Sequence, residues 1–213
     1  MWTEQEPLTE KTDFFLVTPT EVIAEILRIA VGMGGAAELK SVGRFAITCR
    51  RHKQTIETTP DIWANADPGR VISSSWSPPI AAKRLLQWKA LRFCTKLTLF
   101  STLPRDTICS LVGAMPRLVL LDLLRLTTPT DIPTLALVAA KCPALETLRV
   151  YPNWENIHAK RDPISKMTSL TSLEIAGPNT GDVLDRISKF PPKLTCLALQ
   201  TTCNMTEFFK RCS

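Results

Sequence analysis

The sequence predicts an α/β fold: a solenoid of about five stacked strand–turn–helix units with parallel strands, preceded by a small all-α module. Three observations predict this organisation. A leucine dyad recurs at a nearly constant interval, the residues between dyads have helical spacing, and residues 18–64 follow a separate helical pattern. Periods of 20–50 residues are typical of repeat architectures, in which stacked units share one continuous core.

The predicted strands are marked by two apolar residues with one residue between them. The intervals between successive pairs are 24, 27, 25 and 24 residues, within the roughly 20–29 residues of one common repeat class. A further apolar or small residue lies three positions before each pair. The pairs are Leu97-Leu99, Leu121-Leu123, Leu148-Val150, Leu173-Ile175 and Leu197-Leu199, preceded by Cys94, Leu118, Leu145, Leu170 and Leu194. A second interpretation, an unrelated α/β domain whose leucines coincide, stays open at this point.

The predicted helices lie between these strands. Segments 106–112 and 131–138 have apolar residues at helical spacing and an acidic residue where the helix would begin, and 181–187 and 205–209 repeat the theme. A proline then lies two residues before the next leucine, and proline favours extended chain over helix. These prolines are Pro116, Pro143 and Pro192.

The repeat region, residues 91–213, resembles the leucine-rich-repeat family. Cys142-Pro143-Ala144-Leu145-Glu146-Thr147-Leu148-Arg149-Val150 is similar to its cysteine-containing subtype, which is common in ubiquitin-ligase receptors. The family's asparagine after the strand is present only as Asn153; the equivalent places hold Thr102, Leu126, Pro178 and Thr202. The resemblance implies a protein-binding repeat with irregular bonding in the loops.

Residues 18–64 carry a different pattern. An apolar stripe on residues 21–30 follows Pro19, glycines at 32–35 end that helix, and a second helix is expected over about 37–58. The segments Pro19-x-Glu21-Val22-Ile23-x-x-Ile26-Leu27, Cys49-Arg50-Arg51 and Thr59-Pro60-Asp61-Ile62-Trp63 resemble the F-box, a module that docks a Skp-type adaptor of cullin ubiquitin ligases.

The F-box resemblance implies a set of adaptor-binding residues: Pro19, Val22, Ile23, Ile26, Leu27 and Trp63. Thr18 and His52 depart from the family pattern, where leucine and tryptophan are usual, and each departure could weaken the module by about 1–3 kcal/mol. The alternative interpretation is a helical cap that only seals the first repeat.

Around this module we expect a disordered or extended tail at 1–17, and a linker at 65–90 that ends in a capping helix over 80–91.

Alternate residues of a strand face opposite ways, so the residues flanking the inward leucines form rows on the open face. The predicted substrate-binding residues are Lys96, Phe100, Asp122, Leu124, Arg149, Tyr151 and Glu174. The charged row Asp122, Arg149 and Glu174 is either a surface salt-bridge ladder or a recognition stripe. The row Phe100, Leu124 and Tyr151 is either an exposed anchor patch or a surface covered by the linker, with Trp76 as its lid.

Composition narrows the function further. Apolar residues make up 45% and charged residues 22%, as in ordinary soluble domains. Seven cysteines without a CxxC pair, and two histidines, argue against a zinc site or a disulfide framework and for reduced thiols. The chain has no glycine-rich phosphate loop, HExxH or GxSxG. We therefore expect no catalytic, metal or cofactor site.

Together the two resemblances imply the substrate-recognition subunit of a cullin-type (SCF) E3 ubiquitin ligase in the Ubl conjugation pathway. Its partners would be a Skp-type adaptor, through it a cullin, and a protein substrate; we expect a cytoplasmic or nuclear location and no membrane. The alternative is a leucine-rich-repeat scaffold or interaction module without a ligase role. Residues 68–213 carry 19 bases and 10 acids, which raises nucleic acid as a third, disfavoured partner class because the open face is not strongly basic.

Overall fold

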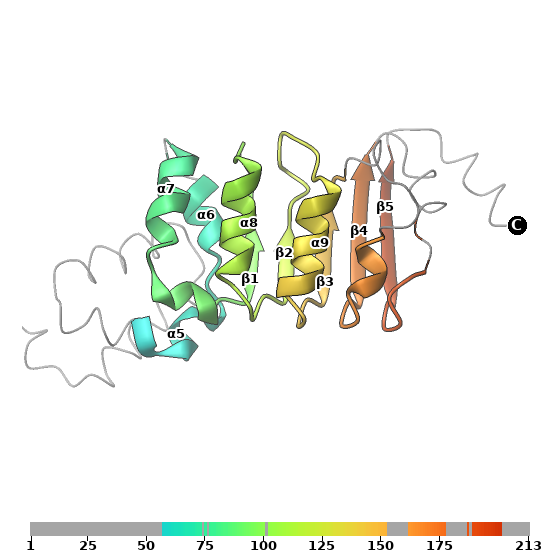
Figure 1. Ribbon diagram of the computed structural model, residues 1–213, viewed down its shortest axis with the longest axis horizontal. Helices are drawn as coiled ribbons and strands as arrows, with labels where there is room; N and C mark the ends of the chain where they lie inside the picture. Colours follow the sequence, from blue (N-terminus) through green and yellow to red (C-terminus); the bar gives the residue numbers. More distant parts are fainter. Residues whose placement is uncertain are drawn as a thin grey trace, which may run out of the picture.

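The computed structural model describes residues 57–73, 75, 77–100, 102–152, 162–177, 187 and 189–201 (Figure 1). The expected tail at 1–17, the expected helices between 18 and 56, and the expected helix at 205–209 lie outside these residues. So does the expected helix at 181–187, apart from Ile187.

Five parallel strands form one sheet in sequence order. The dyads of neighbouring units are in register along the whole sheet, so that Leu97 lies opposite Leu121, Leu148 opposite Leu173, and Leu173 opposite Leu197. The prediction of an α/β fold with parallel strands at the five dyads is confirmed. The strands are β1 (Lys96–Thr98), β2 (Leu120–Asp122), β3 (Thr147–Val150), β4 (Ser172–Gly177) and β5 (Cys196–Thr201).

Helices alternate with the strands and lie side by side on one face of the sheet (Figure 1). The predicted helices at 106–112 and 131–138 are α8 (Arg105–Gly113) and α9 (Ile132–Lys141). Asp131 is the N-cap of α9, and its carboxylate accepts a hydrogen bond from the Thr134 amide at 2.9 Å. Between β3 and β4 the described part of the chain contains only a short 3₁₀ turn, η2 (Ile164–Lys166).

The core is built from the inward residue rows that the repeat predicts. The dyad side chains of β1 to β4 are fully buried, each at 0% exposure. The residue three positions before each of these dyads is also buried: Cys94, Leu118, Leu145 and Leu170. The dyad of β5 differs, because β5 is the last strand of the sheet. Each strand with its inward side chains forms one rung of the stack, and in this fifth rung Leu197 is 39% exposed and Leu199 is only partly buried.

The segment expected to be a linker is largely helical. It contains α6 (Pro68–Ser73) and α7 (Pro78–Leu85), followed by the 3₁₀ helix η1 (Lys89–Phe93), so the single helix expected over 80–91 is in fact two. Ahead of them lies α5 (Pro60–Ala64). Leu85 is buried and Leu86 and Trp88 pack partly buried against the core, as expected of a cap on the first strand.

Helix α6 covers the free edge of β1. The Asp67 carboxylate, 6% exposed, accepts hydrogen bonds from the backbone amides of Thr98 at 2.9 Å and Gly69 at 3.1 Å. An uncovered edge strand presents unpaired backbone groups that invite aggregation. The helix lies so close that a Cβ added at Gly69 would be 2.0 Å from the Thr98 carbonyl oxygen. Asp67 and Gly69, which look like turn residues in the sequence, therefore seal the sheet.

Replacing Leu148 with alanine should lower the free energy of unfolding by about 2–5 kcal/mol, because Leu148 is fully buried between two neighbouring rungs. The matched change Leu197→Ala should cost about 1 kcal/mol or less, because that side chain is 39% exposed. Urea denaturation of both variants measures the difference. Equal losses would contradict the buried-rung description.

Gly69→Ala should destabilise the fold by more than about 1 kcal/mol, because the added methyl would push α6 away from β1. The control is Gly113→Ala at the end of α8, where a Cβ meets nothing within 4 Å. That change should be neutral or stabilise by up to about 1 kcal/mol. Thermal unfolding distinguishes them, and a stable Gly69→Ala protein would show that α6 does not need its close approach to β1.

Candidate functional site

The candidate site is the sheet face opposite the buried dyads. Register pairs Thr98 with Asp122, Asp122 with Arg149, Arg149 with Glu174, and Glu174 with Ala198. The predicted charged row is therefore confirmed as a set of lateral neighbours, one on each strand. Adjacent backbones in a sheet lie about 4.8 Å apart, which is within reach of long charged side chains.

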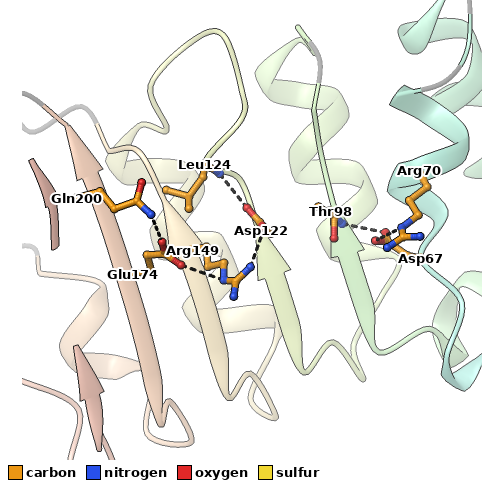
Figure 2. Close-up of polar contacts among 8 residues, drawn as sticks. All are labelled: Asp67, Arg70, Thr98, Asp122, Leu124, Arg149, Glu174 and Gln200. Atoms are coloured by element: carbon orange, nitrogen blue, oxygen red, sulfur yellow. Dashed lines mark hydrogen bonds and ion pairs between the residues drawn. The ribbon is translucent and has the colours of Figure 1, made fainter. Parts of the chain in front are cut away.

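Arg149 joins the two acids of this row into a ladder (Figure 2). Its Nη1 lies 3.4 Å from Oδ2 of Asp122, and its Nε lies 3.0 Å from Oε2 of Glu174. The arginine side chain is 46% exposed, whereas those of Asp122 and Glu174 are 13% and 18% exposed. The guanidinium is thus held between two fixed acids while one part of it faces solvent.

The ladder is anchored at its β2 end by a backbone contact. Oδ1 of Asp122 accepts a hydrogen bond from the Leu124 amide at 3.1 Å, which leaves Oδ2 for Arg149. On the adjoining strand the Thr98 amide donates to Asp67 at the covered edge of the sheet, a contact separate from the ladder (Figure 2). Asp67 also lies 3.7 Å from Arg70 Nε. Asp122 and Asp67 are therefore held by backbone amides, whereas the contacts of Glu174 shown in Figure 2 are with the side chains of Arg149 and Gln200.

Gln200 extends the ladder to β5. Its Nε2 donates a hydrogen bond to Oε1 of Glu174 (Figure 2). Gln200 is not among the predicted substrate-binding residues; the direct partner of Glu174 on β5 is Ala198. The missed signal is the diagonal neighbour two residues further along the strand, which long side chains reach across a sheet.

The predicted aromatic and apolar row lies just beyond the strand ends. Phe100, Leu124 and Tyr151 follow β1, β2 and β3 and are not strand residues themselves. The equivalent positions on the longer strands β4 and β5 are Ala176 and Gln200, which pair with each other. Phe100 is 38% exposed, whereas Leu124 and Tyr151 are partly buried.

The two aromatic rings of this row each contact the following unit. The Arg125 guanidinium carbon lies 5.2 Å from the centre of the Phe100 ring, a cation–π contact. Tyr151 lies against Gly177, where an added Cβ would be 2.9 Å from the ring and the backbone has φ of +150°. Both the close approach of the Tyr151 ring and the positive φ therefore require glycine at position 177. The row is thus a band of partly exposed apolar surface next to the ladder; the suggested lid, Trp76, lies outside the described residues.

Lys96, the remaining predicted substrate-binding residue, lies apart from the ladder. It begins β1 opposite Leu120 and is partly buried. The structure therefore brings Asp122, Arg149 and Glu174 together and places Phe100, Leu124 and Tyr151 along one end of their strands. Lys96 lies at the other end.

The adaptor-binding residues Pro19, Val22, Ile23, Ile26 and Leu27 lie outside the described residues. Trp63 is described, and it is only 2% exposed. Its ring packs edge-on against Trp88, with the ring centres 5.6 Å apart and the planes at 84°, a favourable aromatic geometry. Trp63 thus joins α5 to the segment that caps the repeat core.

Reactive groups do not converge on this face within the described residues. Burial raises the pKa of the Cys94 thiol to about 12, with a further rise from nearby Asp67, and burial raises the pKa of the Cys142 thiol to about 11. Such thiols stay protonated and unreactive near neutral pH. The part of the chain that is described contains no group of three or more His, Cys, Asp or Glu residues able to hold a metal, and no helix there could cross a membrane. His52 and His158 lie outside it.

Cys142 has a structural contact instead. Its Sγ lies 3.9 Å from the carbonyl oxygen of Met115 and 4.0 Å from that of Val112. Val112 lies in the last turn of α8 and Met115 just beyond it, and each carbonyl also accepts a backbone amide, from Met115 and Leu118 respectively. The Cys142 thiol thus packs against the end of the previous unit.

A scan against protein-family models finds no match to this chain, and a search of curated proteins finds no relative.

Replacing Arg149 with methionine should cost only about 1 kcal/mol of stability, because the arginine is half exposed and exposed ion pairs contribute little. The control is Arg105→Met, which removes the exposed 3.1 Å pair with Asp131 and should have a similarly small effect. Chemical denaturation measures both. A loss of about 3 kcal/mol or more for Arg149→Met alone would identify the ladder as a structural element.

Proposed function

We propose that this chain is a substrate receptor of a cullin-type ubiquitin ligase, in which a leucine-rich-repeat region holds a protein substrate and an F-box-like module at 18–64 docks a Skp-type adaptor. The observation that carries the proposal is the in-register parallel sheet whose open face combines a fixed charge ladder with partly exposed Phe100. The F-box resemblance of residues 18–64 supplies the adaptor role.

The open face supports binding rather than chemistry. Arg149 is held by Asp122 and Glu174, and guanidinium groups are frequent anchors in interfaces. The neighbouring band at Phe100, Leu124 and Tyr151 offers apolar area. A receptor of this kind contributes proximity between the substrate and the transferred ubiquitin, so it needs no catalytic residue of its own.

The adaptor contact is proposed through Pro19, Val22, Ile23, Ile26 and Leu27. Trp63, which the resemblance also assigns to this contact, would instead link the module to the repeats, because its side chain is 2% exposed and packs on Trp88. A rigid link of this kind suits a receptor, since it would hold the substrate at a set distance from the adaptor.

The burial of Trp63 also favours one alternative, a repeat scaffold without a ligase role. In that case α5 and the helices before it would serve only as the cap of the first unit. The two functions differ in whether the stripe at 22–27 binds a second protein.

Ile23→Asp and Ile26→Asp should abolish co-purification of a Skp-type adaptor, because a charge on an apolar contact is strongly unfavourable. Affinity capture followed by mass spectrometry measures the adaptor. The control is Glu25→Gln on the same segment but off the stripe, which should retain it. Absence of any adaptor from complexes of the folded wild-type protein would refute the ligase role and leave the scaffold.

A further inference from the structure

A second charged surface lies along the edge of the sheet where the strands begin. Because all five strands run in the same direction, the loops that lead into them lie together along one edge, the lower edge in Figure 1. Every unit places at least one cation on this edge. We call these residues the cationic rim: Lys89, Arg92, Arg117, Lys141, Lys166, Lys189 and Lys193.

Within the described loops, few acids accompany the rim cations. All of the rim side chains are exposed. In the described parts of the loops that enter the strands, Glu146 is the only acidic residue. In the described part of the chain, none of the rim cations forms an ion pair. Cations elsewhere behave differently, since Arg70, Arg105 and Arg149 each lie within 4 Å of a carboxylate. Like charges gathered without counter-charges produce a positive potential that attracts anionic partners.

Interaction with helix dipoles explains the presence of only some of the rim cations. Lys141 is the last residue of α9 and Lys166 the last of η2, where a cation is favoured by the helix terminus. Helix α8 has no basic residue in its last turn. Arg117 and Lys193 lie beyond any described helix, in the loops that enter β2 and β5. Their charges are therefore available to a partner.

Two aromatic residues accompany the cations. The guanidinium carbons of Arg92 and Arg117 lie 4.6 and 5.7 Å from the centre of the Phe93 ring, which positions both side chains. At the other end of the rim Phe190, beside Lys189, is 39% exposed. Binding of single-stranded nucleic acid relies on several open rings on which bases stack. Because Phe93 carries two guanidinium groups, the rim better fits a polypeptide with acidic residues and an apolar anchor.

We infer that the cationic rim binds an acidic, extended segment of a partner protein. Five strands at about 4.8 Å spacing cover about 19 Å between the first and the last, the length of about six residues of extended chain. Carboxylates along that segment would meet a cation at each rung, and one apolar side chain would rest on Phe190. This surface lies along another part of the sheet than the ladder, so it adds a binding site to the proposed function. At its first rung, η1 packs against α5, which belongs to the proposed adaptor module.

The test uses a fluorescein-labelled peptide of repeated Glu-Glu-Phe-Gly and fluorescence anisotropy with the full chain. The wild type should bind, more weakly as salt rises, and K141E/K166E should weaken binding by about tenfold. The control R105E/R125E makes the same change in net charge at the opposite edge of the sheet and should change affinity by less than about twofold.

A second pair, R117E/K193E, reverses cations on other rungs and should behave like K141E/K166E; circular dichroism and thermal unfolding verify that each variant is folded. Equal weakening by the opposite-edge control, or no binding by the wild type, would overturn the rim as a site. Tighter binding of an oligouridylate of equal charge would overturn the choice of a polypeptide. Adaptor capture by K141E/K166E should be unchanged, so that a failure here is distinct from a failure of the ligase proposal.

Discussion

The structure depends on the lateral stacking of aliphatic side chains that point inward from parallel strands. Each inward residue of β1 to β4 is buried against its equivalents on neighbouring rungs, so the core is continuous and no unit could form it alone. Such a stack has two ends, and the ends differ. At β1 a helix and the Asp67 carboxylate cover the edge, whereas at β5 Leu197 remains 39% exposed.

The same stacking determines the surface chemistry. Once Leu121, Leu148 and Leu173 are in register, the residues that follow them must also lie side by side, and this places Arg149 between Asp122 and Glu174. Parallel strands also collect all entering loops on one edge, which gathers cations that are far apart in the sequence. The charge ladder and the cationic rim are therefore both consequences of a single repeat.

Two surfaces of different character suit a protein that holds another polypeptide. The charges of the ladder are paired with one another. The ladder would therefore contribute to partner binding through the fixed positions of its polar groups more than through net charge. Within the described residues the rim cations have no ion-pair partner, and such charge speeds encounter with an acidic partner. As a substrate receptor, the proposed role, the chain would use both without any group of its own taking part in ubiquitin transfer.

The repeat, the strand positions, the register of the outward rows and the helices α8 and α9 can be predicted from the amino-acid sequence, because each depends on local periodicity and on one apolar side chain per inward position. Three features could not be predicted in this way: residues 68–73 form a helix against β1, Trp63 is buried on Trp88, and Gln200 joins the ladder. Those features depend on contacts between residues far apart in the chain: Asp67 looks like the start of a turn until the Thr98 amide, 31 residues later, lies 2.9 Å from its carboxylate.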